Sequence, residues 1–190
     1  MSLKLVLATR NEGKIREIAS ILGRGFELVT LAEVGLTGEL DENSRLIEEN
    51  ALFKARQCFE AAAITSLADD SGLFVDFLKG GPGSLSARYG GSNEERIGRL
   101  LGELAGAADR RAVFRCAIAV VGANSSQIFL GDCPGTITAA PCGQGGFGYD
   151  PVFIPDGFDK TFAEMGDDVK NRISHRAKAL LMAKEFLLSL

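Results

Sequence analysis

The sequence predicts an α/β protein built on a mixed β-sheet. The chain begins with a short apolar strand followed at once by an amphipathic helix, the order typical of a parallel βα unit. Its second half instead carries apolar runs joined by turn residues, the pattern of antiparallel hairpins. Of the 190 residues, 46% are hydrophobic. This is enough for a sizeable core, so we expect a single domain covering residues 1–190.

Strands and helices are predicted to alternate in the first half of the chain. Residues 3–9 (LKLVLAT) form an apolar strand. Residues 12–22 form a helix, because its apolar side chains recur at i, i+3, i+4 and i+7. A second strand covers residues 26–31. A second helix covers residues 44–63, with Ser44 as its N-cap.

The second half begins with a helix over residues 93–104, which has a charged outer face. After this helix, apolar runs with turns at residues 122–126 (GANSS) and 132–135 (DCPG) predict two or three strands. Residues 175–190 carry a helical apolar stripe and form the last helix, with Ser174 as a plausible cap.

Composition excludes several classes of function. The net charge of −4 argues against non-specific binding to duplex nucleic acid, and no apolar run is long enough to span a membrane. The four cysteines form no C-x-x-C pair, so we expect reduced thiols in a cytoplasmic protein rather than a zinc site. The single histidine excludes a His-rich metal centre and leaves hard cations such as magnesium, bound by oxygen.

Asp69 and Asp70 follow a third apolar run. Residues 65–70 (TSLADD) favour a short strand that ends at these carboxylates. A strand end is where α/β folds present chemistry, and two carboxylates there can hold magnesium or take a proton from water. The same residues also favour a plain Asp-Asp-Ser-Gly turn. The residues alone leave both interpretations open.

Residues 8–14 (ATRNEGK) lie where the first strand becomes the first helix. Backbone N–H groups at a helix start attract anions, Lys14 adds a positive charge, and Thr9 and Asn11 can hydrogen-bond phosphate oxygens. The alternative is helix capping, by Asn11 alone or by Thr9 with Glu12. The stretch is not a Walker loop, because G-x-x-x-x-G-K-[ST] is absent.

Three further stretches have both a functional and a structural interpretation. Asn50 and Lys54 share one face of the second helix, and a solvated face is the favoured interpretation. In residues 145–151 (GGFGYDP), glycines let the backbone approach a flat ligand and an aromatic ring can stack on a base, although a hairpin corner explains the pattern equally well. His175 stands beside cations that can bind oxo groups, but a lone histidine at a helix start usually lies on the surface.

Taken together, five stretches occur in the order and spacing of one family: LATRNEGKIREI, EENALFKAR, ADDSGLFVDFLKGGPGSLSARY, GGFGYDPVFIP and KNRISHRAKAL. Over essentially its whole length the chain resembles the inosine triphosphate pyrophosphatases, also called XTP/dITP diphosphatases or Ham-type proteins. The resemblance implies hydrolysis of ITP, dITP and XTP to the monophosphate and pyrophosphate, with magnesium (Mg2+) as cofactor, in a homodimer. It also implies a long mixed sheet flanked by helices, with two lobes around a central substrate cleft.

The resemblance further implies the site residues. Those of the triphosphate end are Thr9, Arg10, Asn11, Glu12, Gly13, Lys14 and Lys54. Asp70 matches the catalytic carboxylate close to the metal, and Ser71 matches a neighbour that contacts the substrate. The residues of the base end are Phe147, Gly148, Tyr149, Asp150, Lys170, His175 and Arg176. Magnesium and two lysines would then offset the adjacent charges of Asp69 and Asp70.

Two departures from the family pattern affect these assignments. Arg10 stands where a small residue is common, so the loop is expected to be less compact. Residues 39–50 (ELDENSRLIEEN) differ from the usual acidic pair followed by Gly and Thr. By its spacing from Asn50, Glu42 falls on the metal-binding glutamate. Two other functions stay open: a nucleotide-binding sensor without hydrolysis, and a pyrophosphatase for other modified nucleotides.

Overall fold

The computed structural model describes residues 2–189. Its helices and strands are, in chain order, β1 (Leu3–Leu7), α1 (Glu12–Leu22), β2 (Phe26–Val29), α2 (Ile47–Ala62), β3 (Ser66–Val75), β4 (Gly81–Gly83), α3 (Asn93–Glu103), β5 (Arg111–Gly122), β6 (Ser125–Ile137), β7 (Phe153–Pro155), α4 (Phe162–Met165), α5 (Asp167–Ile173) and α6 (His175–Leu188). Short 3₁₀ helices are η1 (Gly23–Gly25), η2 (Asp76–Leu78), η3 (Ser86–Arg88) and η4 (Asp150–Val152).

The predicted mixed sheet is confirmed. It has seven strands in the order β2-β1-β3-β5-β6-β7, with β4 paired to β3 beside this path. β1 is parallel to β2 and β3, whereas β5, β6 and β7 continue the sheet antiparallel. The parallel part is thus the βα unit at the start of the chain, and the antiparallel part is the hairpin-rich second half.

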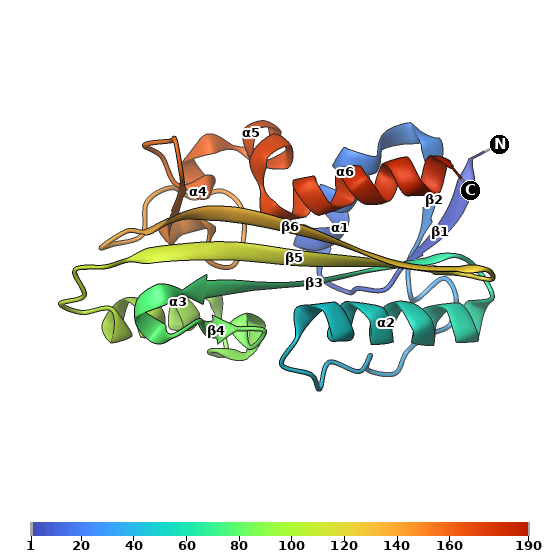
Figure 1. Cartoon of the computed structure of the whole chain (residues 1–190), viewed down its shortest axis with the longest axis horizontal. Helices are drawn as coiled ribbons and strands as arrows, with labels where there is room; N and C mark the ends of the chain where they lie inside the picture. The colour runs from blue at the N-terminus through green and yellow to red at the C-terminus, as the bar shows by residue number, and fades with distance from the viewer. Residues whose placement is uncertain (1, 190) are drawn as a thin grey trace.

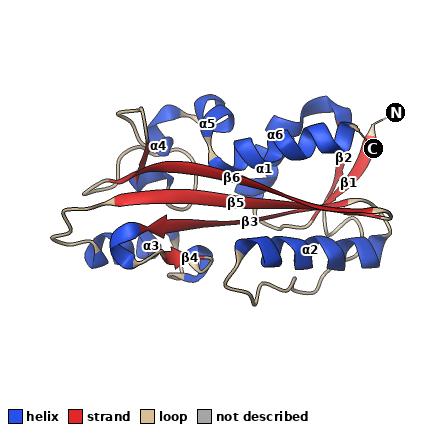
Figure 2. Ribbon diagram, in the orientation of Figure 1, coloured by secondary structure: helices blue, strands red, loops and turns tan. Residues whose placement is uncertain are grey.

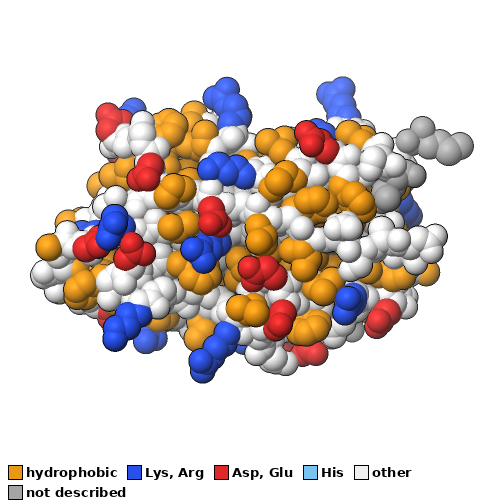
Figure 3. Space-filling view, viewed as in Figure 1, with side chains coloured by type: hydrophobic (Ala, Val, Ile, Leu, Met, Phe, Trp, Pro, Cys, Tyr) orange, Lys and Arg blue, Asp and Glu red, His pale blue; other side chains and the backbone are white. Residues whose placement is uncertain are grey.

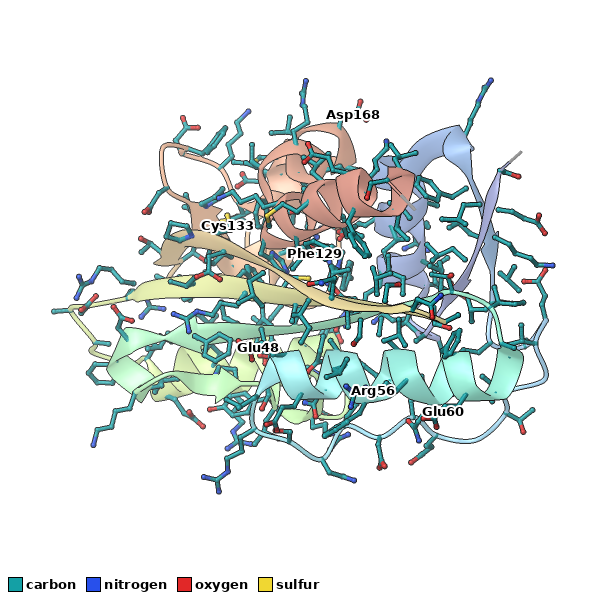
Figure 4. The ribbon with its side chains drawn as sticks, turned by 45° about the vertical axis from the view of Figure 1, so that its right-hand side comes forward. Glu48, Arg56, Glu60, Phe129, Cys133 and Asp168 are labelled. Atoms are coloured by element: carbon teal, nitrogen blue, oxygen red, sulfur yellow. The ribbon has the colours of Figure 1, made fainter. Side chains whose placement is uncertain are left out.

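Helices cover both faces of the sheet. Figures 1 and 2 show α2 and α3 on one face, and α1, α4, α5 and α6 on the other. Alternate residues of β5 supply the two cores: Ile118 packs with residues of α1 and α6, and Ala119 packs with residues of α2. Figure 4 shows Glu48, Arg56 and Glu60 along α2, and Phe129 of β6 beneath α6. The Phe129 ring lies 5.6 Å from that of Phe186, measured between centroids.

One edge of β3 is left partly unpaired, and this gap positions the site. β1 pairs with β3 only as far as Leu67, and β4 begins to pair with it at Leu73. Within residues 2–189, residues 68–72 of β3 therefore have no strand neighbour on that edge. Backbone groups in such a gap must find other partners, because unpaired polar groups are costly when buried.

The structure corrects several of the expected elements. β3 does not end at Asp70 but runs on to Val75, because its other edge stays paired with β5 throughout. The segment DCPG is not a turn but lies inside β6. Pro134 lies where the pairing of β6 with β7 ends: its carbonyl still accepts from the Asp156 N–H at 3.0 Å, and a missing N–H is tolerated at the end of such a ladder.

Helix α2 begins at Ile47 rather than at Ser44. Ser44 is instead fixed by the Asn50 side chain, which bonds both its N–H and its carbonyl, at 2.9 and 3.0 Å. Ser174, in contrast, caps α6 as expected, since its hydroxyl accepts a hydrogen bond from the Ala177 N–H. No helix within residues 2–189 is long and apolar enough to cross a membrane.

A glycine on β6 allows α6 to lie directly on the sheet. A Cβ atom at Gly131 would lie 2.1 Å from the carbonyl oxygen of His175 and 2.7 Å from the backbone nitrogen of Ala179. Both neighbours are helix backbone, which cannot move aside as a side chain can. The first turn of α6 therefore owes its position to the absence of a side chain at residue 131.

We expect Gly131→Ala to lower the free energy of unfolding by about 1–3 kcal/mol or more, because overpacking forces the backbone to shift. Gly98→Ala in α3 is the matched control, since a Cβ there meets no atom within 4 Å. Replacing this exposed helical glycine should stabilise the protein by about 0.4–1 kcal/mol. Urea denaturation measures both, and equal stability of Gly131→Ala and the unchanged protein would contradict the packing argument.

Candidate active site

A cavity of about 940 Å³ lies at the gap in β3. Every residue that the sequence analysis assigned to the site lines it: Thr9, Arg10, Asn11, Glu12, Gly13, Lys14, Glu42, Lys54, Asp70, Ser71, Phe147, Gly148, Tyr149, Asp150, Lys170, His175 and Arg176. We call the part near residues 9–14 and Lys54 the α1 end. The part near Phe147, His175 and Arg176 is the α6 end.

Asp69 and Asp70 point to opposite faces of the sheet. They lie in the middle of β3, where successive side chains alternate. Asp70 faces α2, whereas Asp69 faces α6 and contacts Arg176. Lysines do contact both residues, as expected, but the strand alternation also separates the two carboxylates. The alternative of an Asp-Asp-Ser-Gly turn is wrong, because β3 runs straight through these residues.

Two buried side chains of α2 hold Asp70. The Asn50 amide donates to Oδ2 at 3.0 Å, and the Lys54 ammonium lies 3.4 Å from Oδ1. The preference for a solvated helix face at these two positions is wrong. Lys54 is only 3% exposed, because this face of α2 lies against β3 and β5. Burial raises the pKa of Asp70 above its usual value, and the opposing charges of Lys54 and Lys14 do not cancel that effect.

Glu42 and Asp70 both contact the ammonium group of Lys54. Oε1 of Glu42 accepts from the Lys54 ammonium at 2.6 Å, and its Oε2 lies 3.4 Å from Arg88. Burial would raise the pKa of Glu42, but Lys54 outweighs it and lowers that pKa. The long loop between β2 and α2 thus brings Glu42 to the α1 end of the cavity.

Asn11 is the N-cap of α1. Its side chain accepts from the Lys14 N–H at 3.1 Å, and the Thr9 hydroxyl accepts from the Asn11 N–H at 3.1 Å. Arg10 points to the neighbouring loop, where its Nη2 donates to the carbonyls of Leu36 and Gly38 at 2.9 and 2.7 Å. Arg10 therefore ties this turn to the loop that carries Glu42.

An aromatic ring, that of Phe147, lies against Gly13 of α1 at the other side of the cavity. A Cβ at Gly13 would come within 2.7 Å of the Phe147 ring, so only glycine allows this contact. Asp150 holds the ring's loop, since its Oδ2 accepts from the Phe147 N–H at 2.8 Å and from Lys170 at 2.5 Å. Tyr149 is turned into the core, and its hydroxyl donates to the Ser86 carbonyl at 3.1 Å.

His175 is buried, not on the surface. It is 3% exposed and stacks on Phe114, with 4.7 Å between ring centroids and 8° between planes. The expectation of a surface histidine is wrong because the start of α6 lies against Gly131. Burial, reinforced by the charges of Arg176 and Lys170, lowers the pKa of His175 well below its usual value, so the ring is neutral. Its Nδ1 has no hydrogen-bond partner among the described residues.

Arg176 is the centre of a buried charge network. Its Nε donates to Asp69 Oδ2 at 2.9 Å, its Nη1 to Glu17, and its Nη2 to the Ser71 hydroxyl at 3.1 Å. Glu17 also pairs with Lys170 at 2.7 Å. Burial would raise the pKa of Asp69, but Arg176 and Lys14 hold it well below its usual value.

The sequence analysis did not assign Glu17 or Asn50 to the site, and it did not predict that Asp69 pairs with Arg176. One signal for Glu17 was available, since it lies three residues after Lys14 and next to the buried Ile18, on the inner face of α1. Arg88 also went unassigned, and it lies 3.4 Å from Glu42 at the cavity. The four cysteines are free, as expected.

Within residues 2–189, no cluster of three His, Cys, Asp or Glu side chains could hold a metal by itself. Glu42 and Asp70 offer two carboxylates around Lys54. Magnesium is usually held by one or two carboxylates together with substrate phosphates. The donor set therefore fits a cation that binds together with a phosphorylated ligand.

Comparison with known proteins gives consistent results. The chain is 43% identical to the dITP/XTP pyrophosphatase of Bacillus licheniformis, covering 93% of this chain and 94% of that protein. It is 44% identical to that of Geobacter sulfurreducens, covering 97% and 96%. The Staphylococcus aureus Ham1 protein superposes with a TM-score of 0.89 at 37% identity, covering 98% of each chain. A HAM1 protein from Coxiella burnetii gives 0.89 at 34% identity, covering 99% and 100%.

A model of the Ham1 family matches residues 5–186, which run from within β1 to most of α6. The match thus covers both ends of the cavity and the strand that joins them. With this span and these relatives, the chain belongs to the Ham1 family.

Proposed function

We propose that the protein hydrolyses deaminated purine nucleoside triphosphates (ITP, dITP and XTP) to the monophosphate and pyrophosphate. One observation carries the proposal: a single cavity joins Lys14, Lys54 and the buried Asp70 to an α6 end with an aromatic ring and buried donors. Relatives named dITP/XTP pyrophosphatase support the substrate class. The triphosphate would lie at the α1 end and the base at the α6 end.

Asp70 is the proposed general base. A carboxylate with a raised pKa accepts a proton more readily, and burial raises the pKa of Asp70. Asp70 would orient a water molecule and take its proton as the water attacks the α-phosphorus. Lys14 and Lys54 would then stabilise the negative charge of the departing pyrophosphate.

Magnesium is the proposed cofactor, held by Glu42, Asp70 and the substrate phosphates. When bound, it would neutralise phosphate charge and favour deprotonation of water. Lys54 contacts both carboxylates and keeps them together in the absence of other cations. The balance of charge at this end therefore suits a ligand that brings both phosphate and a divalent cation.

Base selectivity would come from donors at the α6 end. The neutral ring of His175 lines the cavity and can donate one hydrogen bond, from one of its two nitrogens, to a 6-oxo group. Arg176 keeps further N–H groups beyond those bonded to Asp69, Glu17 and Ser71. A 6-amino group would leave these buried donors facing another donor, which is a strong penalty.

We further propose that the protein is a single domain, forms a homodimer and is cytoplasmic. Exposed Ile128 and Leu130 lie on β6 opposite Ala119 and Ala117, on the face that α2 covers elsewhere, and such side chains suit a second copy. Figure 3 shows charged side chains of both signs among hydrophobic ones on one face of the molecule. The mass in solution, measured by sedimentation, decides between monomer and dimer.

The first expected outcome is rapid pyrophosphate release from ITP and XTP with magnesium, slow release from GTP and ATP, and none with EDTA. The 6-oxo donors predict the discrimination against ATP, and the carboxylate pair predicts the dependence on magnesium. Guanine also carries a 6-oxo group, so slow release from GTP is expected from the substrate class of the named relatives. Coupled enzymatic detection of pyrophosphate measures all four substrates. Tight ITP binding without release would favour a nucleotide sensor, and preference for pyrimidine nucleotides would indicate a different pyrophosphatase.

We expect Asp70→Asn to lower kcat for ITP by about 10²–10⁴-fold, the usual contribution of a general base. In the unchanged protein the base must lose its proton first. Activity should therefore rise with pH as Asp70 loses its proton; without magnesium, burial raises the pKa of Asp70 above its ordinary value. Asp76→Asn, on the exposed η2, is the control and should change neither kcat nor the pH profile. Near-normal turnover of Asp70→Asn would refute the role.

His175→Phe should keep the stack on Phe114 but remove the ring N–H. We expect the ratio of kcat/KM for ITP over ATP to fall by at least about tenfold, the size of one lost selective hydrogen bond. Steady-state kinetics with both nucleotides measure the ratio. His175→Asn retains a donor and serves as the comparison variant; an unchanged ratio in both would remove His175 from base recognition.

A further inference from the structure

Asp69 is the residue at which contacts from both ends of the cavity meet. Its Oδ1 forms an ion pair with Lys14 of the α1 end, and its Oδ2 accepts from Arg176 Nε of the α6 end at 2.9 Å. The residue is fully buried, at 0% exposure. It therefore cannot exchange these cations for water, and each cation is one that we have assigned to a different part of the substrate.

The backbone carbonyl of Asp69 also accepts hydrogen bonds from lysines of the α1 end. This carbonyl lies in the gap of β3 and accepts from Lys54 at 2.7 Å and from Lys14 at 3.5 Å. The Ser71 hydroxyl and the Cys116 thiol also donate to Oδ2, at 2.9 and 3.0 Å. The carboxylate thus has four partners, supplied by α1, α6, β3 and β5, and it has little freedom to rotate.

We propose that Asp69 is a positioning residue that couples base recognition at the α6 end to triphosphate binding at the α1 end. This inference rests on the proposed function. A triphosphate that attracts Lys14 leaves more of the Asp69 charge to hold Arg176, which fixes the guanidinium for the base. By reciprocity, a base that orders Arg176 favours triphosphate binding by the same factor.

Fragments of the substrate test the coupling without any turnover. The dissociation constant of inosine is measured by calorimetry in EDTA, with and without saturating tripolyphosphate. We expect tripolyphosphate to tighten inosine binding at least about fivefold in the unchanged protein, the lower range of measured couplings between sites. In Asp69→Asn, which keeps the size but loses the charge, the factor should fall close to one.

Cys116→Ala is the matched control, since it removes one neighbour of Asp69 and leaves the charge in place. It should keep the full coupling factor. Equal factors in Asp69→Asn and the unchanged protein would overturn the inference, and so would the absence of coupling in the unchanged protein. A merely structural role would lower the melting temperature of Asp69→Asn while leaving the factor unchanged.

Lys14→Gln provides a second route if Asp69→Asn does not fold. It removes the ion pair between Lys14 and Asp69 and leaves the contact between Asp69 and Arg176. The coupling factor should again fall close to one, and a full factor would overturn the inference. If the unchanged protein neither binds inosine nor releases pyrophosphate from ITP, the proposed function itself fails. If the unchanged protein releases pyrophosphate from ITP but Asp69→Asn and Lys14→Gln both keep the full coupling factor, only the coupling role of Asp69 is rejected.

Discussion

The burial of a guanidinium beneath the cavity constrains the rest of the structure. Arg176 is 2% exposed and would be very costly to bury without carboxylates around it. Glu17 of α1 and Asp69 of β3 supply them, so three elements distant in sequence must meet at one point. The glycine at residue 131 allows α6 to come close enough to β6 for this meeting.

The cavity lies where one edge of β3 is unpaired. Where β1 has ended and β4 has not begun, the carbonyl of Asp69 accepts from lysine ammonium groups instead of a strand N–H. These contacts with the backbone carbonyl help to hold Lys14 and Lys54 in the cavity. Their charges also hold the carboxylates of the same region, so cations and acids assemble before any ligand is present.

Periodicity predicted the elements that have one apolar face, such as α1, whose bounds of residues 12–22 are those expected. It could not predict the length of β3, because two aspartates look like the end of a strand when their partners lie far away in sequence. Likewise, Lys54 and His175 looked exposed, since only the packing of α2 and α6 buries them. The residues of the cavity were predicted from the family resemblance, whereas Glu17 was identified only in the structure.

The placement of Asp69 and Asp70 on opposite faces of β3 also limits how the chain can vary in length. A one-residue shift of a strand exchanges its faces. A shift in one direction would bring Asp69 to the position of Asp70 but leave Ala68 facing Arg176. A shift in the other direction would keep an aspartate at Arg176 and put Ser71 beside Asn50 and Lys54. Only one alignment satisfies both faces, so insertions and deletions can be accommodated in the loops but not in this stretch of β3.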